Sequence, residues 1–245
     1  CLKRSRAIRL EQLLSVWRRQ VGTANAVLPV ITDGLDPAWI VHLGPDLLVL
    51  NKPHGLLAQP GLGPELADSL ITRVQLQWPQ AQLVHRLDRD TSGLILVALT
   101  PELHRELSRL FAERRVQKCY VADVQGVPEQ ADGWIELPIS KRQHRPPLYG
   151  VDPAGKACST RWRLIEPGGD CSRLELEPLT GRSHQLRVHL RAIGHPMLGD
   201  PLYGAGVAPG IARLHLHAAG LGLVHPKTGQ SLRFAAPVPF VLPAS

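Results

Sequence analysis

Apolar residues recur along this chain in two patterns, as short continuous runs and as longer stretches with helical spacing. The runs at 47–50 and 94–99 are bounded by polar and turn-forming residues and are typical of buried strands. Further strand-like stretches lie at 119–124, 134–139, 159–165, 173–177, 214–223 and 231–234. Because short strands that follow one another through turns tend to pair with their neighbours, the pattern predicts a mixed, mostly antiparallel sheet.

Helical spacing marks four other stretches, predicted as helices at 6–20, at 65–78, from 101 onwards and at 183–193. Thr100 and Pro101 are residue types that begin a helix, as N-cap and first helical residue. The helix at 6–20 is basic and amphipathic, so we expect residues 1–35 to form a basic helical extension. Residues 36–245 would then form a single domain. Helices beside a sheet of short strands define an α+β fold.

The composition is that of an ordinary folded protein with excess positive charge. The 245 residues include 28 Lys and Arg against 21 Asp and Glu, a net charge of +7, and 44% are hydrophobic. The longest apolar run, 94–99, is far shorter than the roughly 20 residues that cross a bilayer, so no membrane partner is expected. Four cysteines without a CxxC pair favour a reducing, cytoplasmic compartment. The charge suits nucleic acid, whereas an aromatic content of 4% provides few surfaces for stacking bases.

The densest group of polar residues occupies 85–93, directly before the apolar run at 94–99. If its first residues are extended, Arg86 and Asp88 project to one side while Leu87 anchors the loop inward. A nearby arginine keeps a carboxylate ionised, and an ionised carboxylate can act as a nucleophile at a sugar or ring carbon. A purely structural ion pair between Asp and Arg would explain the same residues, and the loop alone leaves both readings open.

The second polar group lies on the predicted helix at 183–193. His184, Arg187 and Arg191 share one face of this helix, opposite an apolar face that we expect to pack. N–H groups at the helix start, beside Arg182, would suit an anion such as a phosphate or a carboxylate. A solvated basic face is the alternative interpretation.

Several common chemistries have no counterpart in the sequence. The phosphate-binding loop of nucleoside triphosphate enzymes, the GxGxxG of dinucleotide sites and the GxSxG of serine hydrolases are absent. His184 and His189 are five residues apart, and His215 and His217 have no carboxylate nearby in the sequence, which disfavours a metal site. The sequence therefore predicts carboxylate, arginine and tyrosine chemistry with no cofactor and no metal.

Together these motifs resemble those of the RluA-type pseudouridine synthases. Residues 85–93 are similar to the family's HRLDxxTSG signature, and residues 180–189 to its GRxHQLRVH segment. Further matches follow the family's order: NKPxG at 51–55, KxYxA at 118–122, GHP at 194–196, GDPLYG at 199–204 and LHLHA at 214–218. The resemblance spans residues 40–240. It implies a bent sheet flanked by helices around a central catalytic cleft, in the short branch that modifies tRNA and ribosomal RNA.

The resemblance also implies roles for individual residues. Asp88 aligns with the catalytic aspartate, and Arg187 aligns with the arginine that pairs with this carboxylate. Tyr120 aligns with the tyrosine that stacks on the base and accepts a proton. Arg86 aligns with the arginine that enters the RNA stack as the target base flips out.

Other polar residues are expected to contact the RNA without taking part in chemistry. His85 and His184 are predicted to bind substrate. Arg182, Arg191 and a basic loop at 141–150 are predicted to contact phosphates.

The expected reaction is the isomerisation of uridine to pseudouridine in structured RNA, either tRNA or large-subunit rRNA, by a monomer. Two alternatives stay open, an N-glycosidic hydrolase with an aspartate nucleophile and a non-catalytic RNA-binding module. The lack of an obvious second carboxylate weakens the first, and the retention of Asp88, Tyr120 and Arg187 weakens the second. Residues 1–35 are too short for the S4-type domain of many relatives, so the catalytic domain itself is expected to bind the RNA.

Overall fold

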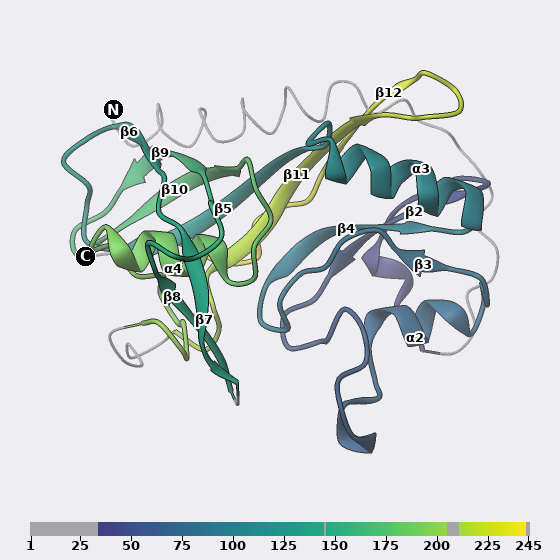
Figure 1. Ribbon diagram of the computed structural model, residues 1–245, viewed down its shortest axis with the longest axis horizontal. Coiled ribbons are helices and arrows are strands. Elements are labelled where there is room, and N and C mark those ends of the chain that lie inside the picture. The colour runs from purple at the N-terminus through teal and green to yellow at the C-terminus, as the bar shows by residue number, and fades with distance from the viewer. Residues whose placement is uncertain (1–33, 145, 205–210, 244–245) are drawn as a thin grey trace. The chain divides into compact units, whose positions relative to one another are not determined.

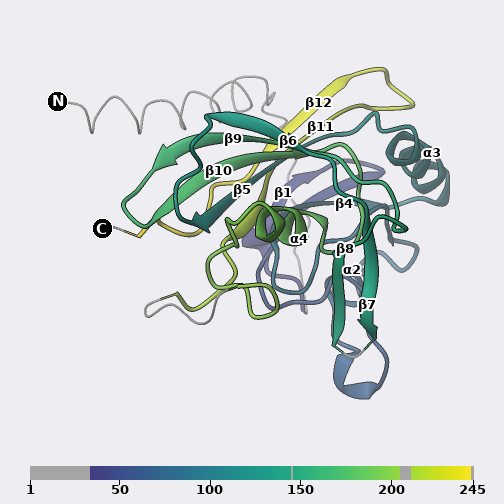
Figure 2. The same ribbon diagram turned by 60° about the vertical axis from the view of Figure 1, so that its left-hand side comes forward.

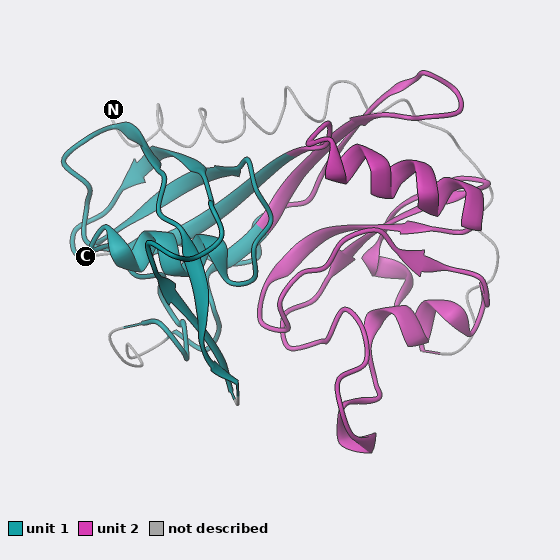
Figure 3. Ribbon diagram, viewed as in Figure 1, with its two compact units in different colours: residues 1–11, 118–217, 238–245 teal, residues 12–117, 218–237 magenta. Residues whose placement is uncertain are grey.

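The computed structural model describes residues 34–144, 146–204 and 211–243. These fall into two compact units (Figure 3). Among the described residues, unit 1 draws on 118–217 and 238–243, and unit 2 draws on 34–117 and 218–237. The helix predicted at 6–20 lies outside the described residues.

Unit 2 is built on a sheet that the apolar runs of the sequence predicted. Its strands follow the order β1-β2-β4-β11, with β3 beside β4 and β12 beside β11. Their bounds are β1 Ile40–Leu43, β2 Leu47–Lys52, β3 Gln82–Leu83, β4 Ser92–Ala98, β11 Leu216–Val224 and β12 Ser231–Ala235. The pairings β1–β2, β2–β4, β3–β4 and β11–β12 are antiparallel.

Every residue of β4 is buried, because the strand is covered on both faces. On one face Leu94 and Leu96 pack with the apolar side of helix α3, Pro101–Ala112. The alternate residues Ile95 and Val97 are equally buried. Figures 1 and 2 show α3 and α2 on opposite sides of β4. A strand buried on both faces reads as a continuous apolar run, which is the pattern seen in the sequence.

The two helices of unit 2 compare differently with their predictions. Helix α3 begins where expected, and the Thr100 hydroxyl accepts the Leu103 N–H at 3.3 Å. Helix α2 is only Leu70–Gln75, so the prediction of a helix over 65–78 was too long. Ser69 is extended and forms a capping box with Thr72, which fixes the helix start there. A separate 3₁₀ turn, η2 Pro64–Leu66, precedes it.

Unit 1 contains a second set of antiparallel strands in the order β5-β10-β9-β6. Their bounds are β5 Gln117–Gln125, β6 Asp132–Ile135, β9 Thr160–Pro167 and β10 Cys171–Pro178. Helix α4, Gln185–Ala192, packs Leu186 and Leu190 into the same core as Trp162 and Leu176. The strand predicted over 134–139 was wrong in its second half, since β6 ends at Ile135 and the chain begins a new strand at Ile139.

The basic loop predicted at 141–150 is instead an antiparallel hairpin, formed by β7 Ile139–His144 and β8 Pro147–Val151. We call residues 139–151 the basic arm. Lys141 and His144 are exposed on it, and Figures 1 and 2 show it extending away from the other strands of unit 1. With most of β7 exposed, the arm has no apolar-polar alternation by which a strand would be recognised in the sequence.

The α+β fold class and the mostly antiparallel pairing are thus confirmed. None of the helices in the described part of the chain is long and apolar enough to cross a membrane.

One glycine of unit 2 fits its place only because it has no side chain. Gly93 has a φ of 115°, and a Cβ there would lie 2.4 Å from the Ala218 carbonyl oxygen. We predict that Gly93→Ala lowers the free energy of unfolding by at least about 2 kcal/mol, through backbone strain and overpacking. Urea unfolding measures this loss.

Gly181→Ala is the matched control, because no atom lies within 4 Å of the added methyl group. Its unfolding free energy should change by no more than about 0.5 kcal/mol. Equal losses in the two variants would contradict the prediction.

Candidate functional site

The loop that carries Asp88 leads directly into β4 of unit 2. Leu87 is 7% exposed and anchors the loop inward, as the sequence predicted, while Arg86 is exposed and Asp88 is half-buried. The Thr91 N–H donates to the Asp88 carbonyl at 3.2 Å, which closes a turn after the aspartate. The carboxylate and the guanidinium are therefore presented by a loop with a buried anchor between them.

His85 holds the beginning of this loop against the sheet. Its Nε2 accepts the Leu96 N–H at 3.0 Å, and its ring stacks on Phe111 with 4.7 Å between centroids. An Nε2 that accepts a hydrogen bond carries no proton, so the ring is neutral with its proton on Nδ1. These contacts give His85 a structural role in the loop.

Lys52 fastens a second loop to the Asp88 loop. Its side chain is fully buried, and Nζ donates to the carbonyls of Pro53 at 2.8 Å, Leu56 at 2.8 Å and Arg89 at 3.0 Å. The Gly55 N–H donates to the same Arg89 carbonyl at 2.9 Å. The sequence showed Lys52 only as part of a motif, because no local pattern reveals that a lysine is buried.

In unit 1, Tyr120 lies on β5 opposite Leu176 of β10. Its ring is half-buried against the core that α4 covers. One part of the ring is therefore fixed by packing while another part is accessible.

Arg187 was placed on the cationic face of the predicted helix, with a solvated basic face as the alternative interpretation, and the structure rules out that alternative for Arg187 because it buries the side chain. The side chain is 2% exposed and makes a bidentate ion pair with Asp200, with Nε–Oδ2 at 2.8 Å and Nη2–Oδ1 at 2.6 Å. Oδ1 of Asp200 also accepts the N–H groups of Leu202 and Tyr203. Burial alone would raise the pKa of Asp200, but Arg187 and these two N–H groups lower it, so the carboxylate stays charged.

The start of α4 also differs from its prediction. The helix begins at Gln185 and not at Ser183, because His184 has a left-handed backbone with φ 55°. Nδ1 of His184 lies 2.7 Å from the Tyr203 hydroxyl, which accepts the Tyr149 N–H at 2.9 Å. His184 is thus tied to the GDPLYG segment and to the basic arm.

A buried polar network holds the segment before α4. The Gln185 side chain accepts from the Thr180 hydroxyl at 2.7 Å and from the Arg182 N–H at 3.0 Å. Its amide group donates to Ser159 and Thr160 of the neighbouring strand region, both at 3.0 Å. The guanidinium groups of Arg182 and Arg191 are left on exposed residues, as binding to phosphate requires.

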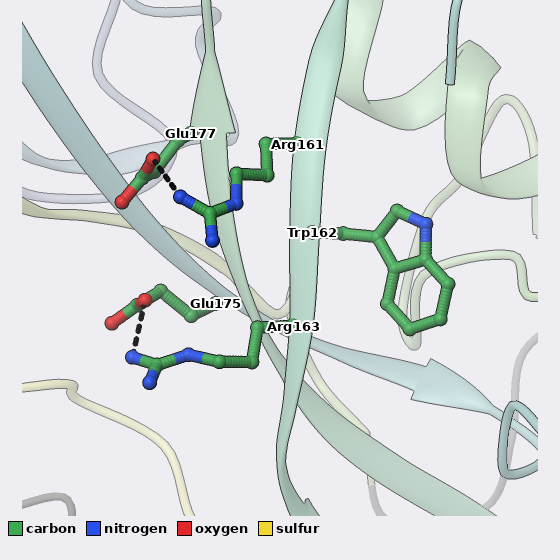
Figure 4. A pocket seen from close by; sticks show the side chains of 5 residues that line it. All are labelled: Arg161, Trp162, Arg163, Glu175 and Glu177. Atoms are coloured by element: carbon green, nitrogen blue, oxygen red, sulfur yellow. Dashed lines mark hydrogen bonds and ion pairs between the residues drawn. The ribbon is translucent and has the colours of Figure 1, made fainter. Parts of the chain in front are cut away.

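A pocket of about 200 Å³ lies elsewhere in unit 1 and contains none of the predicted site residues. Figure 4 shows Arg161 and Arg163 directed toward Glu177 and Glu175, at 3.8 and 2.6 Å, while Trp162 points to the other side of β9. Nearby, burial and the charges of these two glutamates raise the pKa of the Cys119 thiol. The pocket is a set of paired charges with an unreactive thiol beside it.

The predicted residues thus fall into two groups. His85, Arg86 and Asp88 share one loop of unit 2, and Tyr120, Arg182, His184, Arg187 and Arg191 belong to unit 1. Contacts within unit 1 bring His184 and Arg187 together around Tyr203. Sequence reasoning missed Asp200 and Tyr203 as partners, and the only available signal was that both lie in the GDPLYG motif.

Comparison with known proteins finds relatives that are named as pseudouridine or pseudouridylate synthases. Residues 46–192 match the family model of RNA pseudouridylate synthase. The chain is 47% identical over 207 residues to the dual-specificity RNA pseudouridine synthase RluA of Escherichia coli (strain K12), covering 82% of this chain and 94% of that protein. The Yersinia pestis protein of that name is 45% identical over 204 residues, covering 82% and 99%. The structure of Human RNA Pseudouridylate Synthase Domain Containing 1 matches with a TM-score of 0.70 and 32% identity, covering 82% and 84%.

Removing one partner of the buried pair of Arg187 and Asp200 should cost far more stability than breaking an exposed pair of equal length. We predict that Asp200→Asn lowers the free energy of unfolding by about 3–5 kcal/mol, because a buried guanidinium loses its counter-charge. The control Asp68→Asn breaks an exposed pair with Arg73, also 2.6 Å long, and should cost about 0–1 kcal/mol. Urea unfolding of both variants measures the two losses of free energy. Similar losses would contradict the importance assigned to the buried pair.

The buried His189 makes stability depend on pH. Burial lowers the pKa of His189, whose ring nitrogens contact Thr160 at 2.9 Å and the Leu137 carbonyl at 3.0 Å. The unfolded chain takes up this proton near the ordinary histidine pKa of about 6.5, and the folded chain does so only at lower pH. Stability should therefore be complete above about pH 6.5 and should decline as the pH falls below it.

His189→Gln removes this contribution. The decline in unfolding free energy between pH 7 and 5 should become shallower by up to about 1.4 kcal/mol per pH unit, even if the variant is less stable at every pH. Burial also lowers the pKa of His42, but that residue is present in both proteins and its effect cancels. Parallel stability-pH curves would show that His189 does not contribute.

Proposed function

This chain belongs to the RNA pseudouridylate synthase family, and on that premise we propose that it modifies uridines in both tRNA and ribosomal RNA. It is an RNA pseudouridine synthase, as the motifs indicated. The observation that carries the dual substrate is the 47% identity, over 94% of its length, to a relative described as a dual-specificity enzyme. The finer assignments below rest on motif positions and on the contacts within each unit.

In the proposed reaction Asp88 is the nucleophile, attacking either the ribose C1′ or the uracil ring. The N1–C1′ bond breaks, the uracil turns, and C5 bonds to the same C1′. The C5 proton is lost and N1 gains one, so product and substrate are isomers and no cofactor is consumed. Two features support Asp88, its half-buried position and a loop held in place by Leu87 and Lys52.

Arg187 supplies positive charge for the Asp88 carboxylate in this proposal. Asp200 fixes the guanidinium through Nε and Nη2. Tyr120 stacks on the turned base and accepts the C5 proton. Arg86, which is exposed, takes the place of the flipped base in the RNA stack, where a planar guanidinium can replace a base.

In this proposal the RNA backbone is bound by basic side chains that the structure leaves exposed. Arg182 and Arg191 lie at the two ends of α4, and Lys141 and His144 lie on the basic arm. A two-stranded ribbon with cationic side chains suits a folded RNA because it can follow a phosphate backbone without reading bases.

We propose that residues 36–245 act as one catalytic domain, in a monomer that works in the cytoplasm where its RNA substrates are found.

Release of tritium tests the function directly. RNA carrying tritium at uracil C5 should release it on incubation with the protein, from both tRNA and ribosomal RNA, without free uracil. Free uracil would indicate a hydrolase. Release of neither tritium nor uracil from any cellular RNA would exclude both the isomerase and the hydrolase. Release from only one RNA class would contradict the dual substrate while leaving the family assignment intact.

Asp88→Asn tests the nucleophile. We expect it to bind RNA like the wild type in a filter assay while its turnover falls at least about a thousandfold, as when a covalent catalyst is removed. Asp90→Asn is the matched control in the same loop, since Asp90 pairs with its exposed neighbour Arg89 at 3.0 Å and has no assigned role. Retained turnover in Asp88→Asn would remove Asp88 from its role.

A further inference from the structure

Tyr203 is the point where three parts of unit 1 meet. It is 3% exposed and lies in the segment that follows Asp200. Its hydroxyl contacts the backbone of Tyr149 in the basic arm and the ring of His184 at the start of α4. Its ring lies 5.0 Å from the Arg187 guanidinium, within the range of a cation–π contact.

The hydrogen bonds at the hydroxyl can be assigned from their donors. The Tyr149 N–H can only donate, so the Tyr203 oxygen accepts it at 2.9 Å. The hydroxyl keeps its own proton to donate, and Nδ1 of His184, 2.7 Å away, is within hydrogen-bond distance to accept it in the tautomer that carries its proton on Nε2. This assignment satisfies the arm, the hydroxyl and the histidine together.

His184, which contacts this hydroxyl, has an unfavourable backbone conformation. His184 has a φ of 55°, a conformation that residues other than glycine rarely adopt, and it gives α4 no side-chain cap. The bond from Tyr203 helps to hold it there, so the start of α4 depends on the same hydroxyl as the arm.

Apolar packing joins the base of the arm to the same residue. Tyr203 forms a buried cluster with Ile139 of the arm and Val188 of α4, against which Leu148 and Val151 pack. The backbone of Tyr203 is also fixed, since its N–H donates to Oδ1 of Asp200 at 3.0 Å. Asp200 thus aligns Tyr203 and Arg187 with one carboxylate.

We propose that Tyr203 is a positioning residue that couples the basic arm to Arg187. Its hydroxyl positions the arm and His184 for binding RNA through hydrogen bonds. Its ring positions the Arg187 guanidinium, which the proposed reaction uses, through the cation–π contact. The inference rests on the proposed function, because it assumes that the arm binds RNA and that Arg187 serves the chemistry. Loss of the hydroxyl and loss of the ring should therefore have different kinetic effects.

Tyr203→Phe removes the hydroxyl and keeps the ring. The arm and His184 lose one hydrogen-bond partner, so KM for tRNA in the tritium-release assay should rise about three- to tenfold, the effect of one such bond. The value of kcat should stay within about twofold, because uniform binding alone is weakened. The Tyr149 amide should also exchange with deuterium faster, measured by NMR.

Tyr203→Leu removes the ring as well. Since Arg187 then loses its support, kcat should fall at least about tenfold in addition to the rise in KM. Ser172→Ala is the control for a buried hydroxyl lost elsewhere in unit 1, where Ser172 donates to the Gly126 carbonyl at 2.8 Å. It should change neither constant, which separates positioning from a general loss of stability.

Lys141→Ala separates failure of this inference from failure of the proposed RNA contacts. If Lys141→Ala leaves KM unchanged, the arm does not bind RNA and the premise fails. If Lys141→Ala raises KM and Tyr203→Phe does not, the premise holds and the coupling through Tyr203 is wrong. A fall in kcat for Tyr203→Phe equal to that of Tyr203→Leu would also overturn the coupling.

Discussion

A lysine ammonium that is shielded from water must find acceptors inside the protein, and the Asp88 loop depends on how Lys52 does so. Lys52 ends β2 and faces Gly93 of β4 in the antiparallel register. Its ammonium donates to three backbone carbonyls, two in the next loop and one at Arg89. Because carbonyls have fixed positions along the chain, satisfying one charge determines the path of both loops. The half-exposed carboxylate of Asp88 is therefore presented by backbone that is already ordered.

Unit 1 solves the corresponding problem for a guanidinium. Arg187 is nearly as buried as Lys52, but its partner is a carboxylate, Asp200, which is itself held by two backbone N–H groups. In both units a buried charge is held by groups whose own positions are fixed. Such an arrangement needs little reorganisation when charge develops during a reaction, which is the condition for effective electrostatic catalysis. Lys52, Arg187 and Asp200 are accordingly buried. Arg86, which is proposed to enter the RNA stack, is exposed.

Much of this fold could be predicted from short-range patterns. The apolar run of β4 and the Thr100 and Pro101 start of α3 are local signals, and both were confirmed. The basic arm was missed because its pairing buries little on either face, and α2 was drawn too long because Ser69 was not recognised as its cap. The candidate residues came from motifs, but their partners did not. Tyr203 bonds to a residue 54 positions away, and no periodicity reports a contact of that range.

The ion pairs across β9 and β10 affect how an RNA meets this protein. Arg161 and Arg163 are each matched by a glutamate, so this row of side chains carries no net charge although the chain as a whole carries +7. A phosphate approaching it would first have to displace a carboxylate from its arginine. Long-range attraction to a polyanion is then strongest at cations that have no such partner, and fewer encounters end in unproductive complexes.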